Sequence, residues 1–227
     1  MSTESLLKLG RELAWPLALM LLLLTLVETT SMDHWVTSLF YNPVSGSFPL
    51  NKTFLYKQVL HDWGRDLAYL SAVLVLAGLA YSWYAKLPSW RPPLGFIFLS
   101  LLLSTGTIAL IKYSSSIHCP IDLLEYGGQF QPEDLLSFTH IQQAAGRCWP
   151  SGHASTGFCF LGFFYAARVY RPHWAKPILI FAVTLGVVFS MDQTARGLHF
   201  FSHGLWTALI IWTINVLLAA TMRRQPI

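Results

Sequence analysis

The chain has 227 residues, of which 54% are hydrophobic and only 11% are charged. Soluble domains carry about a quarter charged residues, so this composition excludes an ordinary soluble domain and predicts a protein that buries most of its surface in lipid. The net charge of +4 does not indicate a nucleic-acid partner, because the basic residues gather in short segments expected on one side of a membrane.

Six apolar segments are long enough, or nearly so, to cross a hydrocarbon core, which requires about 20 helical residues. They span residues 13–30, 66–85, 93–113, 153–171, 176–192 and 202–222. The first is expected to be an uncleaved anchor, because no small-residue cleavage site follows it. We therefore predict an all-α fold: a polytopic membrane protein with six transmembrane helices, forming a single domain over residues 1–227.

Basic residues set the expected orientation of these helices. If the N-terminus lies inside, the cytoplasmic segments contain Lys8, Arg11, Lys86, Arg91, Arg168, Arg171, Lys176, Arg223 and Arg224, and only Glu4 and Glu12 among the acids. This bias follows the positive-inside rule. Both termini are then expected in the cytoplasm, and the connections 31–65 and 114–150 lie outside.

The two external connections differ in pattern. Within residues 54–63, Leu55, Val59 and Trp63 recur at helical spacing, which fits a short amphipathic helix on the membrane surface equally as well as an apolar loop. Residues 114–150 show no sustained period. Ordered loops of this length are usually functional, so we expect this one to lie over a site.

The loop 114–150 also contains Cys119 and Cys148. If the external face is an oxidising compartment, these two cysteines are expected to form a disulfide, and two free thiols are the alternative. A zinc site that joins a cysteine to His118 or His140 is a further alternative, although no closely spaced ligand pair supports it. Cys159 lies within an apolar segment and is expected to be a buried apolar residue.

Pro150, Ser151, Gly152 and His153 begin the fourth apolar segment. The start of a helix presents unpaired N–H groups and the positive end of the macrodipole, which suit a phosphate oxygen. Gly152 would let the backbone approach closely, Ser151 adds a hydroxyl, and His153 can exchange a proton near neutral pH.

Fixed positive charge is expected beside this helix start. Lys112 ends the third segment, and Arg196 precedes the sixth. Together with the helix N-terminus, they would form a clamp for a doubly negative group, of the kind that stabilises a transferring phosphoryl group.

His199 and His203 begin the sixth segment, four residues apart, and are expected on one face of a helix. A histidine whose ring is hydrogen-bonded by a neighbour one turn away is held in one tautomer and can act as a nucleophile. The same spacing suits a metal, but the third, carboxylate ligand is missing, because Asp192 lies about two turns away across a loop. The clustering of these histidines with Lys112 at one membrane level favours an enzyme.

These residues resemble the type-2 phosphatidic acid phosphatase superfamily. Its pattern has three parts: Lys, six residues, Arg-Pro; then Pro-Ser-Gly-His; then Ser-Arg, five residues, His, three residues, Asp. Lys112, residues 150–153 and His199 match it, and the resemblance extends over the third to sixth segments, a motif-bearing core at 93–222. The N-terminal third agrees only in hydropathy.

The resemblance implies a two-step displacement without metal or cofactor. His199 matches the nucleophile, which carries a phosphohistidine. His153 matches the general acid that protonates the leaving lipid oxygen. Lys112, Ser151 and Gly152 match phosphate-binding positions.

Three positions depart from the family pattern. Cys119 and Gln193 occupy the two motif arginine positions, and His203 occupies the aspartate position. Loss of a fixed charge costs transition-state stabilisation, so Arg196 and Arg147 are our candidates for replacing it. His203 is expected to accept the hydrogen bond from His199 and so to support catalysis while neutral, which predicts a nucleophile that weakens at acid pH.

The resemblance implies a membrane lipid phosphatase whose site faces the periplasm from a bacterial inner membrane. Its substrate would be a lipid phosphate or diphosphate, such as phosphatidic acid, phosphatidylglycerol phosphate, undecaprenyl diphosphate or a lipid A phosphate. Membrane lipids are then the expected partners. A phosphotransferase between lipids that uses the same phosphohistidine and a non-catalytic, transporter-like relative are the alternatives.

Overall fold

The computed structural model describes residues 3–132 and 146–222, and regular secondary structure in these ranges is entirely helical, which confirms the all-α class. The elements are α1 Thr3–Glu28, α2 Met32–Ser38, η1 Pro49–Lys52, η2 Leu55–Trp63, α3 Gly64–Tyr84, η3 Pro88–Trp90, α4 Arg91–Ser114, η4 Pro120–Asp122, η5 Leu124–Tyr126, α5 Gly152–Phe158, α6 Leu161–Tyr170, α7 Pro172–Ala195 and α8 Phe201–Met222.

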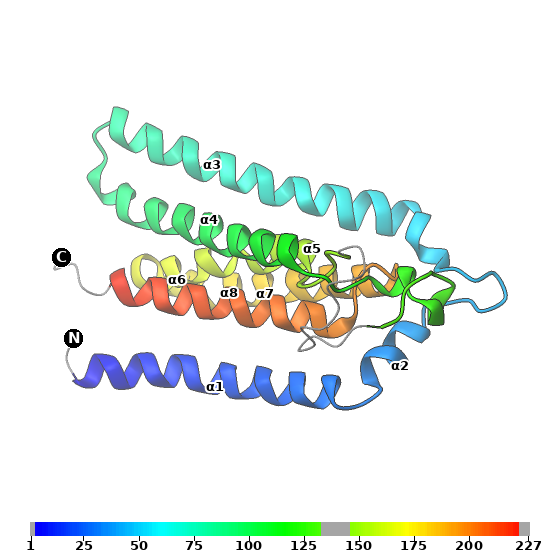
Figure 1. The fold of residues 1–227 in the computed structure, drawn as a ribbon. Helices are drawn as coiled ribbons and strands as arrows, with labels where there is room; N and C mark the ends of the chain where they lie inside the picture. Colours follow the sequence, from blue (N-terminus) through cyan, green and yellow to red (C-terminus); the bar gives the residue numbers. More distant parts are fainter. Residues whose placement is uncertain (1–2, 133–145, 223–227) are drawn as a thin grey trace.

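The long helices run side by side, and both chain termini lie at the same end of the bundle (Figure 1). The short helix α2 and the segments 39–54 and 115–132 lie at the opposite end (Figure 1). This arrangement places the residues before α5 and between α7 and α8 at one end, far from the termini. We call this the loop end.

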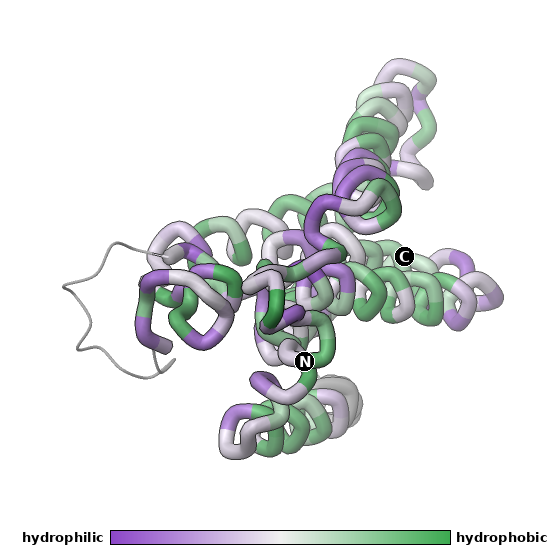
Figure 2. The backbone as a smooth tube through the Cα atoms, turned by 90° about the vertical axis from the view of Figure 1, so that its right-hand side faces the viewer, coloured by the Kyte–Doolittle hydropathy of each residue, from purple (hydrophilic) through white to green (hydrophobic). Residues whose placement is uncertain are grey.

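Four helical stretches are long and apolar enough to cross a membrane: 55–84, 88–114, 172–195 and 201–220. A fifth span arises if Ala14–Glu28 and Met32–Ser38, which meet at 74°, are counted together. Figure 2 shows apolar residues predominating along the helices. The helices are consistent with an integral membrane protein of four or five such spans, fewer than the six expected.

The difference is clearest in the fourth predicted segment, 153–171, which forms two short helices, α5 and α6, interrupted at Cys159 and Phe160. Polar side chains in α5 bond back to the carbonyls of their own turn: Ser155 Oγ donates to Gly152 O (2.6 Å) and Thr156 Oγ1 to His153 O (2.8 Å). Such bonds compete with the backbone ladder and bend helices.

The core of the bundle is built around α5 and α6, which pack against α4, α7 and α8. Buried apolar side chains of these helices, including Ile108, Leu161 and Ile211, form one cluster. Within it, the buried Asn215 amide bridges α8 to α4, since its Nδ2 donates to Ser104 Oγ (3.2 Å). Hydrogen bonds of this kind join helices inside membranes.

Residues 55–63 form a π-helix, η2, which continues directly into α3. The segment is helical, so the plain-loop alternative is wrong, but it belongs to one continuous stretch, Leu55–Tyr84, and is not the separate short surface helix that was expected. Because η2 extends α3 at the loop end, it brings the backbone and side chains of residues 60 and 61 to the start of α5.

Candidate active site

The turn between α7 and α8 carries His199. Gly197 takes φ +70°, and a Cβ there would meet the Phe48 ring at 2.4 Å, so only glycine fits both the backbone and the space. The amide of His199 lies 3.3 Å from the carbonyl of Gln193 as a hydrogen-bond donor. The turn is therefore held by its own backbone and by a side chain from the connection 39–48.

His199 and His203 are in direct contact, with their Nδ1 atoms 3.2 Å apart. One of these nitrogens carries a proton and the other accepts it, since two bare nitrogens could not hydrogen-bond. Both residues are only 4% exposed. The expected pairing is confirmed, but not on one helix face: His199 precedes α8, which begins at Phe201, and the turn brings its ring to His203.

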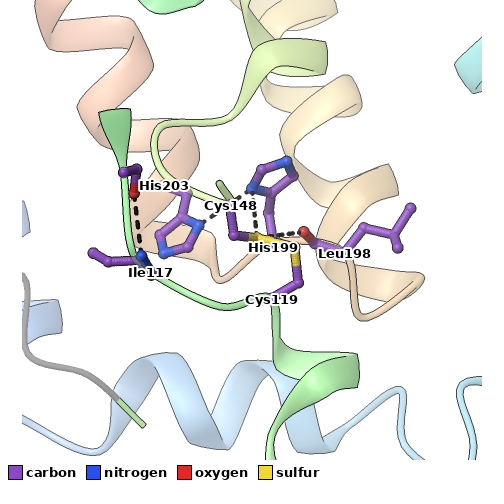
Figure 3. Close-up of a disulfide and its surroundings, with 7 residues drawn as sticks. Ile117, Cys119, Cys148, Leu198, His199 and His203 are labelled. Atoms are coloured by element: carbon purple, nitrogen blue, oxygen red, sulfur yellow. Dashed lines mark hydrogen bonds between the residues drawn. A yellow bond between two sulfur atoms is a disulfide. The ribbon is translucent and has the colours of Figure 1, made fainter. Parts of the chain in front are cut away.

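A disulfide joins Cys119 to Cys148 and lies against this histidine pair (Figure 3). The Sγ of Cys148 is 3.5 Å from Nδ1 of His199 and 3.0 Å from the carbonyl oxygen of Leu198. The predicted disulfide is present, and it removes both thiolates from the alternative zinc site; His140 lies outside the described residues. The loop 114–150 therefore contacts the site through its two cysteines, as expected.

Burial holds the pKa of His199 well below its usual value of 6.5, and the positive charge of Lys112 acts in the same direction. The imidazole of His199 is consequently neutral at neutral pH. A neutral ring whose Nδ1 is engaged by His203 keeps its Nε2 lone pair available for attack.

Lys112 and the Ser151–His153 segment come together as predicted. A Cβ on Gly152 would lie 3.6 Å from Lys112 Cδ and 4.0 Å from its Nζ, so the lysine side chain runs along the start of α5. The hydroxyl of Ser151 accepts a hydrogen bond from the amide of Ala154 (3.3 Å), and its own amide donates to the carbonyl of His203 (3.3 Å). Ser151 thus caps α5 and ties it to α8.

His153 lies in a second group of polar side chains. Its Nε2 donates to the carbonyl of Leu60 (3.1 Å) and is 3.9 Å from Oδ2 of Asp192. Its ring stacks on Phe189, with centroids 4.6 Å apart, and lies 4.4 Å from the ring of His61. Two segments distant from it in the sequence, η2 and the end of α7, therefore position this imidazole.

The two residues near the third motif differ in role. Gln193, at the arginine position, donates from Nε2 to Asp192 Oδ2 (2.6 Å) and faces His61 Nδ1 at 3.4 Å. Arg196 is 5% exposed; its Nη1 is 3.7 Å from Asp192 Oδ2 and its Nε donates to Asn51 Oδ1 (3.3 Å). Nη1 makes no hydrogen bond among the described residues. A buried guanidinium nitrogen without a hydrogen-bond acceptor is suited to an incoming anion.

Arg147 is placed differently from Arg196. It is exposed, and its guanidinium lies 4.5 Å above the ring of Tyr113. Its amide donates to the carbonyl of Ser115 (3.1 Å), which fixes the chain against the end of α4. The described contacts of Arg147 do not include the histidines, so Arg196 is the stronger candidate for the lost motif arginine.

The sequence reasoning missed several side chains in this region, among them His61, Asp192 as a neighbour of His153, and Asn51. The family pattern contains neither His61 nor Asn51, and only the amphipathic pattern at 54–63 indicated that this segment is ordered. Asp33 was also missed; its Oδ1 accepts a hydrogen bond from the amide of Ser202 (2.9 Å), beside His203.

Comparison with protein-family models gives one match, to the model described as PAP2 superfamily, over residues 93–226. This range contains Lys112, both motif histidines and the disulfide, but not η2 with His61. No curated protein and no solved structure matched the chain.

Proposed function

Since the chain belongs to the PAP2 superfamily, whose members are phosphatases, we propose that it is a membrane phosphatase that hydrolyses a lipid phosphomonoester or diphosphate through a phosphohistidine on His199. The observation that carries this proposal is the contact of His199 with His203, at 3.2 Å, together with the electrostatic effect of Lys112 on the same ring. A neutral nucleophile and a fixed positive charge are the two requirements for attack on a phosphate dianion.

In the first step, Nε2 of His199 attacks phosphorus while its Nδ1–H donates to Nδ1 of His203. The N–P bond forms as the bond from phosphorus to the lipid oxygen breaks. His153 supplies a proton to that oxygen, which leaves as an alcohol or, from a diphosphate, as a monophosphate. A phosphate dianion beside His153 favours the protonated ring that this step requires.

In the second step, neutral His153 accepts a proton from a water molecule, whose oxygen attacks phosphorus. The N–P bond breaks, inorganic phosphate leaves, and His199 returns to its neutral form. The same group acts as acid and then as base, as microscopic reversibility requires of a double displacement.

Phosphate binding is assigned to Lys112, Arg196 and the start of α5, with Gly152 allowing close approach of the backbone. Nη1 of Arg196 supports its assignment, since it is buried, lies 3.7 Å from Asp192 Oδ2 and has no hydrogen-bond acceptor among the described residues. These groups supply the charge that the motif arginines supply elsewhere in the family. They perform this role without a metal ion.

We further propose six crossings, with α5 and α6 together forming the fourth, and an active site on the periplasmic face of a bacterial inner membrane. The position of both termini at one end of the bundle supports an even number of crossings (Figure 1). The disulfide at the loop end supports an oxidising compartment there, and the basic residues of the other connections support a cytoplasmic location for the termini.

The test is phosphate release by purified protein in detergent with a chelator present, over a panel of lipid monophosphates and diphosphates. We expect release from at least one lipid, and its loss in His199→Ala. His173→Ala is the matched control, because this exposed histidine begins α7 at the opposite end from the site.

The alternatives give different results in this assay. Release that requires an added lipid acceptor, with no free phosphate, would identify a phosphotransferase. Release from no lipid and transfer to no acceptor would indicate a non-catalytic relative and contradict the proposal, as would full activity in His199→Ala.

A further inference from the structure

We propose that His61, His153 and Asp192 form a binding site for a divalent transition-metal ion of the zinc class, and that the ion inhibits the enzyme by coordinating His153. One ligand atom from each residue lies within 4.8 Å of the other two. His153 and Asp192 are buried, and His61 is partly buried at the loop end. Two imidazoles and one carboxylate are a ligand set that zinc uses in sites with an open fourth position.

The geometry needs only a small contraction. Ligands about 2.0 to 2.2 Å from a tetrahedral ion lie about 3.4 Å from one another, so rotations that move the side chains by about 1 Å suffice. The Asp192 carboxylate is already close to His153, since its Oδ2 is 3.9 Å from Nε2 of the ring. The proton that Nε2 shares with the carbonyl of Leu60 is the one that an ion would replace.

The surroundings of the three ligands also fit an ion. Oδ1 of Asp192 is buried and makes no hydrogen bond in the described part of the chain, although the residue is only 1% exposed. An unpaired carboxylate oxygen inside a protein is costly, and a cation would satisfy it. Gln193 contacts both Asp192 and His61 through Nε2, as outer partners of metal ligands commonly do.

A departure from the family pattern removes a positive charge that would repel this ion. An arginine at position 193 would place a fixed positive charge beside both Asp192 and His61, whereas Gln193 is neutral. Arg196 remains 3.7 Å from Oδ2 of Asp192, so the carboxylate keeps one cation partner and offers its other oxygen. His61 lies outside the range matched by the family model, so the family match does not include the complete ligand set.

The second histidine pair is a weaker competitor for such an ion. The nearest potential third ligand of His199 and His203 is Cys148, and its sulfur is held in the disulfide with Cys119. Zinc binds the thiolate form of cysteine, which a disulfide does not provide. The pair therefore offers two strong ligands, while the His61 group offers three.

The experiment is titration of Co²⁺ into detergent-purified protein without a polyhistidine tag, followed by visible absorption, since Co²⁺ in a tetrahedral site absorbs far more strongly than hydrated Co²⁺. We expect a saturable band that Zn²⁺ displaces. His61→Ala should weaken binding at least about 100-fold and His173→Gln should leave it unchanged, because loss of outer partners alone costs about 10- to 100-fold. Asp192→Asn serves as a second ligand variant, and circular dichroism and size-exclusion profiles establish that each variant is folded.

Inhibition is measured separately and rests on the proposed phosphatase activity. Zn²⁺ should inhibit the wild-type protein, and His61→Ala, compared with its own metal-free rate, should resist about 100 times more Zn²⁺. No band at millimolar Co²⁺, or a band that survives His61→Ala and disappears in His203→Ala, would overturn the site. Binding without inhibition would overturn the role given to His153. An inactive protein that still shows the band would contradict the proposed function and leave the site supported.

Discussion

Two groups of histidines lie at the loop end, and they are built in opposite ways. His199 and His203 come from one turn and one helix start, four residues apart, and contact each other directly. His153 is positioned by residues 60, 61, 189 and 192, from η2 and α7. A local pair gives a neutral imidazole with one fixed partner, which suits a nucleophile. The assembled group gives a histidine beside a carboxylate, which suits proton transfer and metal binding.

The comparison predicts that alanine replacement in one histidine group changes the rate of hydrolysis differently from replacement in the other. Replacement of His153 by alanine should slow hydrolysis of a lipid phosphate about 10²- to 10⁴-fold, because the leaving oxygen loses its acid. With p-nitrophenyl phosphate, whose phenolate leaves without a proton, the first step should be slowed much less, and the remaining loss should lie in hydrolysis of the phosphohistidine, for which His153 is the base. His199→Ala should abolish both reactions. Release of the leaving group in the first turnover is measured for each variant with both substrates, and equal losses of His153→Ala on the two substrates would contradict the assignment of His153 as the acid.

Replacement of Arg196, which is buried, and of Arg147, which is exposed, should affect the rate to different extents. Arg196→Ala should lower the rate about 10²- to 10³-fold, as expected for one lost donor to the developing charge. Arg147→Ala should change it less than about threefold, since this side chain is exposed above Tyr113. Rates with saturating lipid decide the matter, and a larger effect at Arg147 would reverse our choice between them.

The histidine pair should also set the acid limit of activity. Burial lowers the pKa of His199, so the nucleophile stays neutral as pH falls below 6.5 and becomes protonated only at the lower, folded-state pKa. In His203→Asp, a carboxylate beside the ring favours the imidazolium and raises that pKa by about 1 to 3 units. The acid limb of the pH–rate profile should therefore move to higher pH. An acid limb at the same pH in both proteins would show that position 203 does not control His199.

The same shift bears on stability. His199 binds a proton with a pKa near 6.5 when unfolded but resists it when folded, so its burial favours the native state fully above pH 6.5 and progressively less as pH falls below it.

The smallest expected effect on rate comes from the disulfide, which borders only the local pair. The Cys119→Ser and Cys148→Ser double variant should lose about 2 to 4 kcal/mol of stability, because the bond closes a loop across a sequence separation of 29 residues. Thermal unfolding of the wild-type protein with and without reductant measures the loss. The double variant, already lacking the bond, is the control and should not respond to reductant.

The sequence was sufficient where function rests on local spacing. The His199–His203 contact, the helix start at Gly152, the approach of Lys112 and the Cys119–Cys148 bond were all predicted. Each follows from a motif, a helix end or a compartment rule. Even here the detail differed, because a glycine turn at Gly197, not a helix, brings the histidines together.

Long-range contacts could not be predicted in this way. Asp192 was placed across a loop from the site, yet it faces His153, because α7 packs on α5 with Gly186 directly against the ring of Phe158. The break between α5 and α6 was missed because their residues are uniformly apolar enough for one span.

The central claim is that His199 carries the phosphoryl group, and its most direct test is to trap that intermediate. Protein mixed with a ³²P-labelled lipid phosphate is denatured in alkali within the first turnover, and the label is mapped by mass spectrometry. We predict an acid-labile, alkali-stable phosphate on His199 in the wild-type protein that is absent from His199→Ala. Hydrolysis of the lipid with label on no residue, or with label on His203, would contradict the account.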